Sequence, residues 1–206
     1  MRQNIKKIAF ILIVSPVLVW ILIHPAAIIK EWARLPSYFK NNIHSLIGSD
    51  TLAKVNEERW NSFGTNKENL LSKVYYNKGT VLVDDFFTML TYLSPRIYFQ
   101  AGDGTNFSPP GVEPIAIPIF VFWVLGFIAL LKENKFKLIL AVLFFGVFTY
   151  FVGQKTLAFL FPVVLIYLAI SVIGIESIKS KKTKKTIYIL LSLYGIYLLG
   201  RIFILK

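Results

Sequence analysis

Five long apolar segments constrain this chain more than any other feature of its 206 residues. They cover residues 8–29, 114–131, 138–154, 156–175 and 186–205, and only the last carries a charge, near its end. The hydrocarbon core of a bilayer is about 30 Å thick, and a helix crosses it with about 20 apolar residues. The segments are close to this length, although 138–154 is a little short. The sequence therefore predicts transmembrane helices rather than a soluble core.

The composition agrees with this prediction. Charged residues make up only 17% of the chain, whereas a soluble domain carries about a quarter. The chain has no cysteine, which excludes disulfides, zinc–thiolate sites and thiol catalysis within it. The expected fold class is an all-α membrane protein with about five transmembrane helices and one large extracytoplasmic loop containing short interfacial helices.

The N-terminal segment has two interpretations. Residues 1–7 are basic and precede an apolar run, as in a secretory signal peptide. However, residues 8–29 form an uncharged run of 22 residues, which is longer than a typical signal-peptide core, and no clear small-x-small cleavage site follows. We therefore expect an uncleaved transmembrane helix within residues 1–29.

The positive charges predict an orientation in the membrane. With the N-terminus in the cytoplasm, the cytoplasmic segments 1–7, 132–137 and 176–185 hold 3, 3 and 5 Lys and Arg. Residues 30–113, on the other side, hold 9 Lys and Arg and 9 acids. By the positive-inside rule, we expect a multi-pass protein of the cell membrane with a cytoplasmic N-terminus and an extracytoplasmic C-terminus. This distribution accounts for most of the net charge of +12 without nucleic acid. The expected partner of the lysine cluster at residues 179–185 is membrane lipid.

The expected organisation has three parts. An N-terminal transmembrane helix lies within residues 1–29, an extracytoplasmic region covers residues 30–113, and a four-helix transmembrane region covers residues 114–206. Inside the middle region, segments 31–42 and 80–99 place aromatic and apolar residues at helical spacing. This pattern predicts helices that lie at the membrane interface.

Three charged residues at or just outside the non-cytoplasmic boundary are candidates for binding a lipid phosphate or a substrate: Arg96, Asp103 and Lys155. Arg96 follows a proline between aromatic residues, and Lys155 lies in a three-residue turn between two predicted spans. A cation at this depth can bind a lipid phosphate. The alternative is snorkelling, in which the charge simply reaches the interface.

Motifs for other chemistry are missing from the sequence. It contains no HExxH pair and no glycine-rich phosphate loop, so we predict no metal site and no cofactor. The adjacent acids Asp84 and Asp85 could bind a divalent cation. Neighbouring residues on a helix point about 100° apart, so we expect acids stabilised near a helix start instead. We also interpret His24 as an interfacial structural histidine.

Several stretches resemble a known family when they are taken together. Residues 76–78 read Tyr-Asn-Lys, and residues 85–103 read DFFTMLTYLSPRIYFQAGD. A Pro/Gly stretch at 109–114, an apolar helix at 117–126 and a short turn at 153–157 follow in order. This series resembles polyprenyl-phosphate-dependent glycosyltransferases of the GT-C class, in the group similar to dolichyl-phosphate-mannose protein mannosyltransferases.

The resemblance implies a role for this part of the chain, but the chain also departs from the family pattern. It covers roughly residues 57–175 and implies that this part helps to form the lipid-carrier groove and the outer cap of a transfer site. The family carries its catalytic acid in a first extracytoplasmic loop, which Asp84 and Asp85 do not match by position. Arg96 stands where an acid is common, so no catalytic residue is predicted.

Two functions follow as expectations. The chain could correspond to the C-terminal half of a lipid-linked-sugar glycosyltransferase that is not catalytic alone. Its partners would be a polyprenyl-phosphate sugar and an N-terminal half or other membrane subunit. The alternative is a non-catalytic accessory or lipid-binding membrane subunit. A small transporter is disfavoured, because the spans carry almost no charges of the kind that mark a substrate path.

Overall fold

The computed structural model describes the backbone of residues 2–47 and 49–204. The described side chains are those of residues 7–42, 52–77, 79–81, 83–84, 86–100 and 102–204. Every regular element in this part of the chain is helical. The helices are α1 (Arg2–Val14), α2 (Pro16–Ile23), α3 (Pro25–Ala33), α4 (Leu35–Ile47), α5 (Ser49–Phe63), η1 (Gly64–Asn66), α6 (Leu70–Tyr75), α7 (Lys78–Tyr92), η2 (Ile97–Ala101), η3 (Ile117–Ile119), α8 (Phe120–Lys132), α9 (Lys137–Val152), α10 (Leu157–Glu176) and α11 (Lys181–Ile204).

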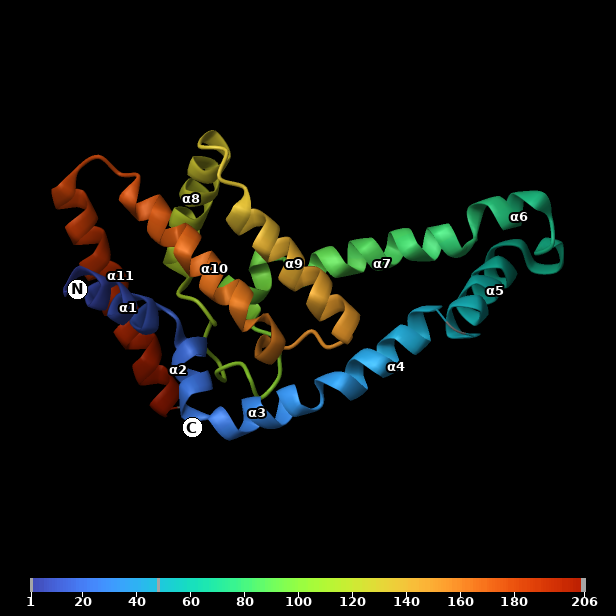
Figure 1. Ribbon diagram of the computed structural model, residues 1–206, viewed down its shortest axis with the longest axis horizontal. Coiled ribbons are helices and arrows are strands. Elements are labelled where there is room, and N and C mark those ends of the chain that lie inside the picture. The colour runs from blue at the N-terminus through green and yellow to red at the C-terminus, as the bar shows by residue number, and fades with distance from the viewer. Residues whose placement is uncertain (1, 48, 205–206) are drawn as a thin grey trace.

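Helix α10 forms the centre of the bundle. Twelve of its 20 residues are buried, whereas four of the 24 residues of α11 are buried. It packs against α8 and α9, and α11 packs against α1 and α2 (Figure 1). The described elements fit an all-α membrane protein, because α10 and α11 are each long and apolar enough to cross a bilayer.

Helices α8 and α10 approach each other at two glycines. A Cβ atom at Gly126 would collide with the carbonyl oxygen of Ile170, and one at Gly174 would collide with that of Phe122. Each carbonyl lies one turn before the opposite glycine, so the backbones touch where the two helices cross. Small residues are typical of such crossings in membranes, where close van der Waals packing drives helix association.

The predicted first transmembrane helix is not continuous. Residues 8–29 form parts of three helices, with breaks at Ser15 and His24 and a bend of 83° between α2 and α3. Pro16 and Pro25 are the first residues of the helices that follow the breaks. Proline suits this position, because its missing N–H group needs no partner there. Residues 8–29 are therefore divided among three helices, and the expected membrane span within residues 1–29 would be a broken one.

The lengths and composition of the helices do not confirm the expected count of about five spans. Two helices pass as membrane spans by length and composition, and up to four do so if each bent pair is one span. The second bent pair joins residues 117–132 to α9 with an angle of 116°. The short turn predicted before residue 157 is present: α9 ends at Val152, and Gly153 adopts φ 73° as its left-handed cap.

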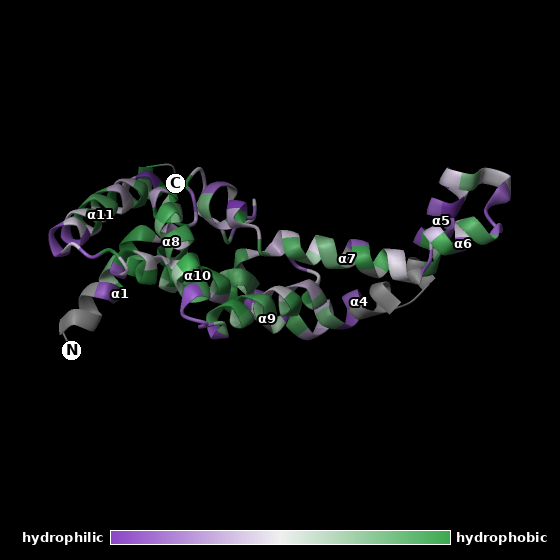
Figure 2. Ribbon diagram, turned by 90° about the horizontal axis from the view of Figure 1, so that it is seen from above, coloured by the Kyte–Doolittle hydropathy of each residue, from purple (hydrophilic) through white to green (hydrophobic). Residues whose placement is uncertain are grey.

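The middle of the chain forms a helical arm, which we define as α4 to α7. Figures 1 and 2 show the arm extending from the bundle, with α5 and α6 at its far end. Helices α4 and α7 both contact α9 where the arm leaves the bundle. Asn77 begins α7 by accepting hydrogen bonds from the backbone N–H groups of Gly79 and Thr80. The arm contains short helices, and Figure 2 shows that they carry both apolar and polar residues.

Candidate functional site

The segment that follows α7 is held against α10 by two tyrosines. The hydroxyl of Tyr167, on α10, donates to the carbonyl oxygen of Leu93 at 2.7 Å. The hydroxyl of Tyr98 donates to the carbonyl oxygen of Tyr92 at 2.6 Å, and this side chain is fully buried. The tyrosine rings also contact each other, with centroids 4.8 Å apart. These contacts fix the position of the intervening residue Arg96.

Arg96 lies at the edge of a small groove. It precedes η2 and is exposed. The groove has a volume of 190 Å³ and is lined by Pro95, Arg96, Phe99, Gln100, Ile117 and Phe120. Among the described side chains, none forms a hydrogen bond or ion pair with the Arg96 guanidinium. Its five donors are therefore free to bind an anion at the end of a largely apolar surface.

A second groove lies on the other side of Pro95, between α8 and α9. It has a volume of 220 Å³, and α10 contributes Tyr167 and Ile170 to its lining. The remaining residues are apolar or aromatic: Leu93, Pro95, Trp123, Phe127, Ile139, Val142 and Leu143. The buried Nε1 of Trp123 finds no hydrogen-bond partner within the described part of the chain. The two grooves share Pro95 as a lining residue, and Arg96 lines the smaller one.

Asp103 has a structural role in this arrangement. Its carboxylate accepts hydrogen bonds from the backbone N–H of Leu157 and from the N–H and hydroxyl of Thr105. Leu157 is the first residue of α10, where backbone donors have no partner inside the helix. A carboxylate there satisfies a donor and interacts favourably with the helix dipole. Asp103 therefore caps the central helix rather than facing a groove.

Lys155 fastens the turn between α9 and α10 to the end of α7. Its ammonium donates to the hydroxyl of Thr91 at 3.0 Å and lies 5.3 Å from the ring centroid of Tyr92. Partial desolvation lowers the pKa of Lys155. The structure thus brings Lys155 and Asp103 to the same turn, while Arg96 lies apart from them on the groove.

The other candidate residues do not form a reactive centre. Asp84 is exposed on α7, and the side chain of Asp85 lies outside the described residues. Within the described part of the chain, no three His, Cys, Asp or Glu side chains come together to hold a metal ion. The ring of His24 packs on Trp20, with centroids 4.2 Å apart, and its Nδ1 lies 3.1 Å from the Trp20 carbonyl oxygen. These contacts fit a structural role for His24.

Sequence reasoning did not identify the aromatic lining of the groove. Trp123 and Tyr167 belong to predicted spans and were treated there only as apolar residues. Their rings lie 5.1 Å apart between α8 and α10. The sequence does contain a signal for this lining: aromatic residues with a polar group in the middle of an apolar segment. Their N–H and O–H groups usually have hydrogen-bond partners when they are buried.

Comparison of the chain with protein-family models, with curated proteins and with solved structures gave no match. The family resemblance therefore stays a prediction from the motifs alone.

Proposed function

We propose that this chain is a membrane-embedded subunit that binds a polyprenyl-phosphate lipid carrier. The phosphate binds Arg96, and the hydrocarbon chain lies in the apolar groove beside it and in the second groove, between α8 and α9, which shares Pro95 with the first. One observation carries the proposal: Arg96, which has no partner among the described side chains, lines a largely apolar groove that shares Pro95 with a second apolar groove. Guanidinium groups bind phosphate through paired hydrogen bonds, which suits this end of the ligand.

The proposed topology has five crossings: α1 together with α2, then α8, α9, α10 and α11. The N-terminus lies in the cytoplasm of a cell-membrane protein, and the helical arm lies outside. The contacts support this arrangement, because they join residues that the charge distribution assigns to one side. Lys7 and Lys184, both assigned to the cytoplasm, contact Glu176. Lys155 and Thr91, both assigned to the outside, contact each other.

The proposed role is to hold the lipid carrier, with sugar transfer completed by a partner subunit. General-base catalysis needs a positioned base, such as a carboxylate. No acid lines either groove among the described residues, and Asp103 is engaged in capping α10. A partner that supplies the acid would make this chain part of a glycosyltransferase that acts on an extracytoplasmic acceptor. Without such a partner, it would act as an accessory lipid-binding subunit.

Lipid binding tests the proposal directly. The probes are a long-chain polyprenyl phosphate and the matching polyprenol, titrated into purified protein while Trp fluorescence is recorded. We expect Arg96→Gln to weaken binding of the phosphate at least tenfold, because hydrogen bonds to a charged group contribute about 1.5–3 kcal/mol. Binding of the polyprenol should not change.

Arg34→Gln is the matched control, because Arg34 is exposed and pairs only loosely with Glu31 at 3.7 Å. It should bind the phosphate as the unmodified protein does. Equal affinity of the unmodified protein for the phosphate and the alcohol would overturn the proposed role of Arg96. So would an Arg96→Gln variant that keeps full affinity for the phosphate.

Cysteine labelling tests the topology. The natural chain has no cysteine, so Ser62→Cys and Ser180→Cys each introduce a single reactive thiol. With a membrane-impermeant maleimide applied to intact cells, residue 62 on the arm should label and residue 180 should label only after lysis. Labelling of both from the same side would refute the orientation.

A further inference from the structure

We infer that a groove between α1 and α11 is a binding site for an anionic phospholipid of the cytoplasmic leaflet. The groove has a volume of 630 Å³, within the range typical of ligand sites. Its lining residues are Lys7, Ala9, Phe10, Ile13, Glu176, Lys185, Tyr188, Ile189, Ser192 and Leu193. None of them lines the grooves near Arg96, so this site does not rest on binding of a lipid carrier, although its assignment to the cytoplasmic leaflet rests on the topology proposed above.

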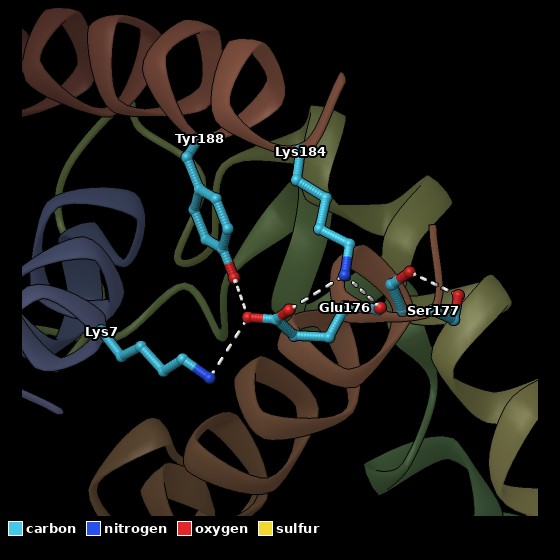
Figure 3. A network of polar contacts seen from close by, with 6 residues as sticks. Lys7, Glu176, Ser177, Lys184 and Tyr188 are labelled. Carbon is cyan, nitrogen blue, oxygen red and sulfur yellow. Dashed lines mark hydrogen bonds and ion pairs between the residues drawn. The ribbon is translucent and has the colours of Figure 1, made fainter. Parts of the chain in front are cut away.

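The polar end of the groove is built around Glu176, the last residue of α10 (Figure 3). Its carboxylate pairs with the ammonium of Lys7 from α1 and with that of Lys184 from α11, each at 3.2 Å. It also accepts a hydrogen bond from the Tyr188 hydroxyl at 3.3 Å. Three helices are therefore joined at one carboxylate, which holds the lysines at a fixed place.

The charge at this end is not balanced by the protein. Lys7, Lys184 and Lys185 bring three positive charges, against one negative charge on Glu176, for a local net charge of +2. Lys184 is engaged twice, because its ammonium also donates to the Glu176 carbonyl oxygen at 2.7 Å. Lys185 has no partner among the described side chains and is exposed at the groove. The unbalanced charge selects an anion, and Lys7 and Lys185 are the groups placed to bind it.

The remainder of the groove is apolar. Phe10 and Ile13 form one wall on α1, and Ile189 and Leu193 form the other on α11. The ring of Phe10 packs edge-on against Tyr188, with centroids 4.7 Å apart. Ile189 and Leu193 are 50% and 59% exposed, so the groove is open along its side. An acyl chain can enter laterally and lie along these helices.

The far end of the groove is closed by a backbone contact. A Cβ atom at Gly195 of α11 would collide with the carbonyl oxygen of Ile13 of α1, so the two helices touch there. Between this contact and the Glu176 cluster, the small residues Ala9 and Ser192 leave space at the lining. The groove thus has a cationic end, apolar walls and a closed far end. This arrangement fits an amphiphile with one anionic headgroup. The cytoplasmic leaflet carries anionic lipids, and the positive-inside rule places Lys7 and Lys185 on that side of the membrane.

Native mass spectrometry of the purified protein tests the inference. Phosphatidylglycerol and phosphatidylcholine serve as the anionic and zwitterionic probes, with matched acyl chains. We expect the unmodified protein to retain phosphatidylglycerol at least tenfold more strongly than phosphatidylcholine. The double variant Lys7→Gln/Lys185→Gln should lose this preference, while the matched control Lys132→Gln/Lys135→Gln, in another predicted cytoplasmic segment, should keep it. Equal retention of the two lipids, or a preference that survives in the Lys7/Lys185 variant, would overturn the site.

A second variant separates the groove from general surface charge. Leu193→Trp adds bulk to an exposed wall without changing the charge, so it should fold and should reduce phosphatidylglycerol retention at least fivefold. Leu190→Trp, at an exposed position of α11 that does not line the groove, is its control and should have no effect. If Leu193→Trp binds phosphatidylglycerol as strongly as the control, the lipid is held by surface electrostatics and the groove assignment is wrong.

Discussion

Substitution of Gly126 by alanine should destabilise the protein because α8 and α10 touch there. The added Cβ would collide with the carbonyl oxygen of Ile170, and a backbone oxygen cannot rotate away as the end of a side chain can. Forcing an extra methyl group into a packed interface costs about 1–3 kcal/mol. We place Gly126→Ala toward the upper part of this range, at about 2–3 kcal/mol, because α8 must move away from α10.

A smaller effect acts in the opposite direction. Alanine is favoured over glycine inside a helix by about 0.5–1 kcal/mol. The expected net loss for Gly126→Ala is therefore about 1–2.5 kcal/mol. For a chain of this size, 1 kcal/mol corresponds to a shift in Tm of about 2–4 °C. Thermal unfolding of the detergent-solubilised protein should show a decrease in Tm of about 2–10 °C.

Gly200→Ala serves as a control, because its effect on Tm should be the opposite of that of Gly126→Ala. It lies in α11, and a Cβ atom there would meet no atom within 4 Å. Gly200→Ala should therefore keep or raise Tm, since only the helix preference acts. Gly174→Ala should behave like Gly126→Ala, and the double variant should cost less than the sum because both residues form one crossing. The close approach of α8 and α10 would be refuted if Gly126→Ala raised Tm as Gly200→Ala does.

Three further outcomes follow from the contacts around α10. Asp103→Ala should lower the stability by about 0.5–2 kcal/mol because Leu157 loses its capping acceptor, whereas Asp103→Asn should cost less; thermal unfolding measures both. Tyr167→Phe should cost about 0.5–1.5 kcal/mol by removing its hydrogen bond to Leu93, and an unchanged Tm would contradict this. The lowered pKa of Lys155 means that the unfolded chain binds this proton more tightly. The free energy of unfolding should therefore increase as the pH rises from the folded-state pKa of Lys155 to the pKa of a free lysine. Lys155→Gln should remove this increase.

The helical class and the apolar segments could be predicted from the sequence because each depends on local composition. The same is true of the short turn before residue 157, where Gly153 supplies the left-handed cap. The breaks at Ser15 and His24 were missed, although Pro16 and Pro25 are visible in the sequence. A proline in lipid can be tolerated within a helix or can begin a new one, and neighbouring helices decide between the two.

The candidate site was predicted only in part, because its contacts join distant residues. The sequence predicts Asp103 near a span boundary, but it does not reveal its partner Leu157, which is 54 residues away. Thr91 is 64 residues from Lys155. A charge pattern gives the depth of such residues in a membrane but not their partners. Arg96 differs because no described side chain pairs with its guanidinium, and no sequence rule separates it from the two engaged residues.

The capping of α10 by Asp103 sets an order of events during biosynthesis. The ribosome delivers Asp103 before Leu157, and at about 5–20 residues per second the intervening 54 residues take about 3–10 s to synthesise. During this interval the segment after α7 lacks two partners. The N-terminal end of α10 is not yet available to Asp103, and the hydroxyl of Tyr167 is not yet available to the carbonyl oxygen of Leu93. The segment after α7 therefore completes these contacts only after the first half of α10 has been synthesised.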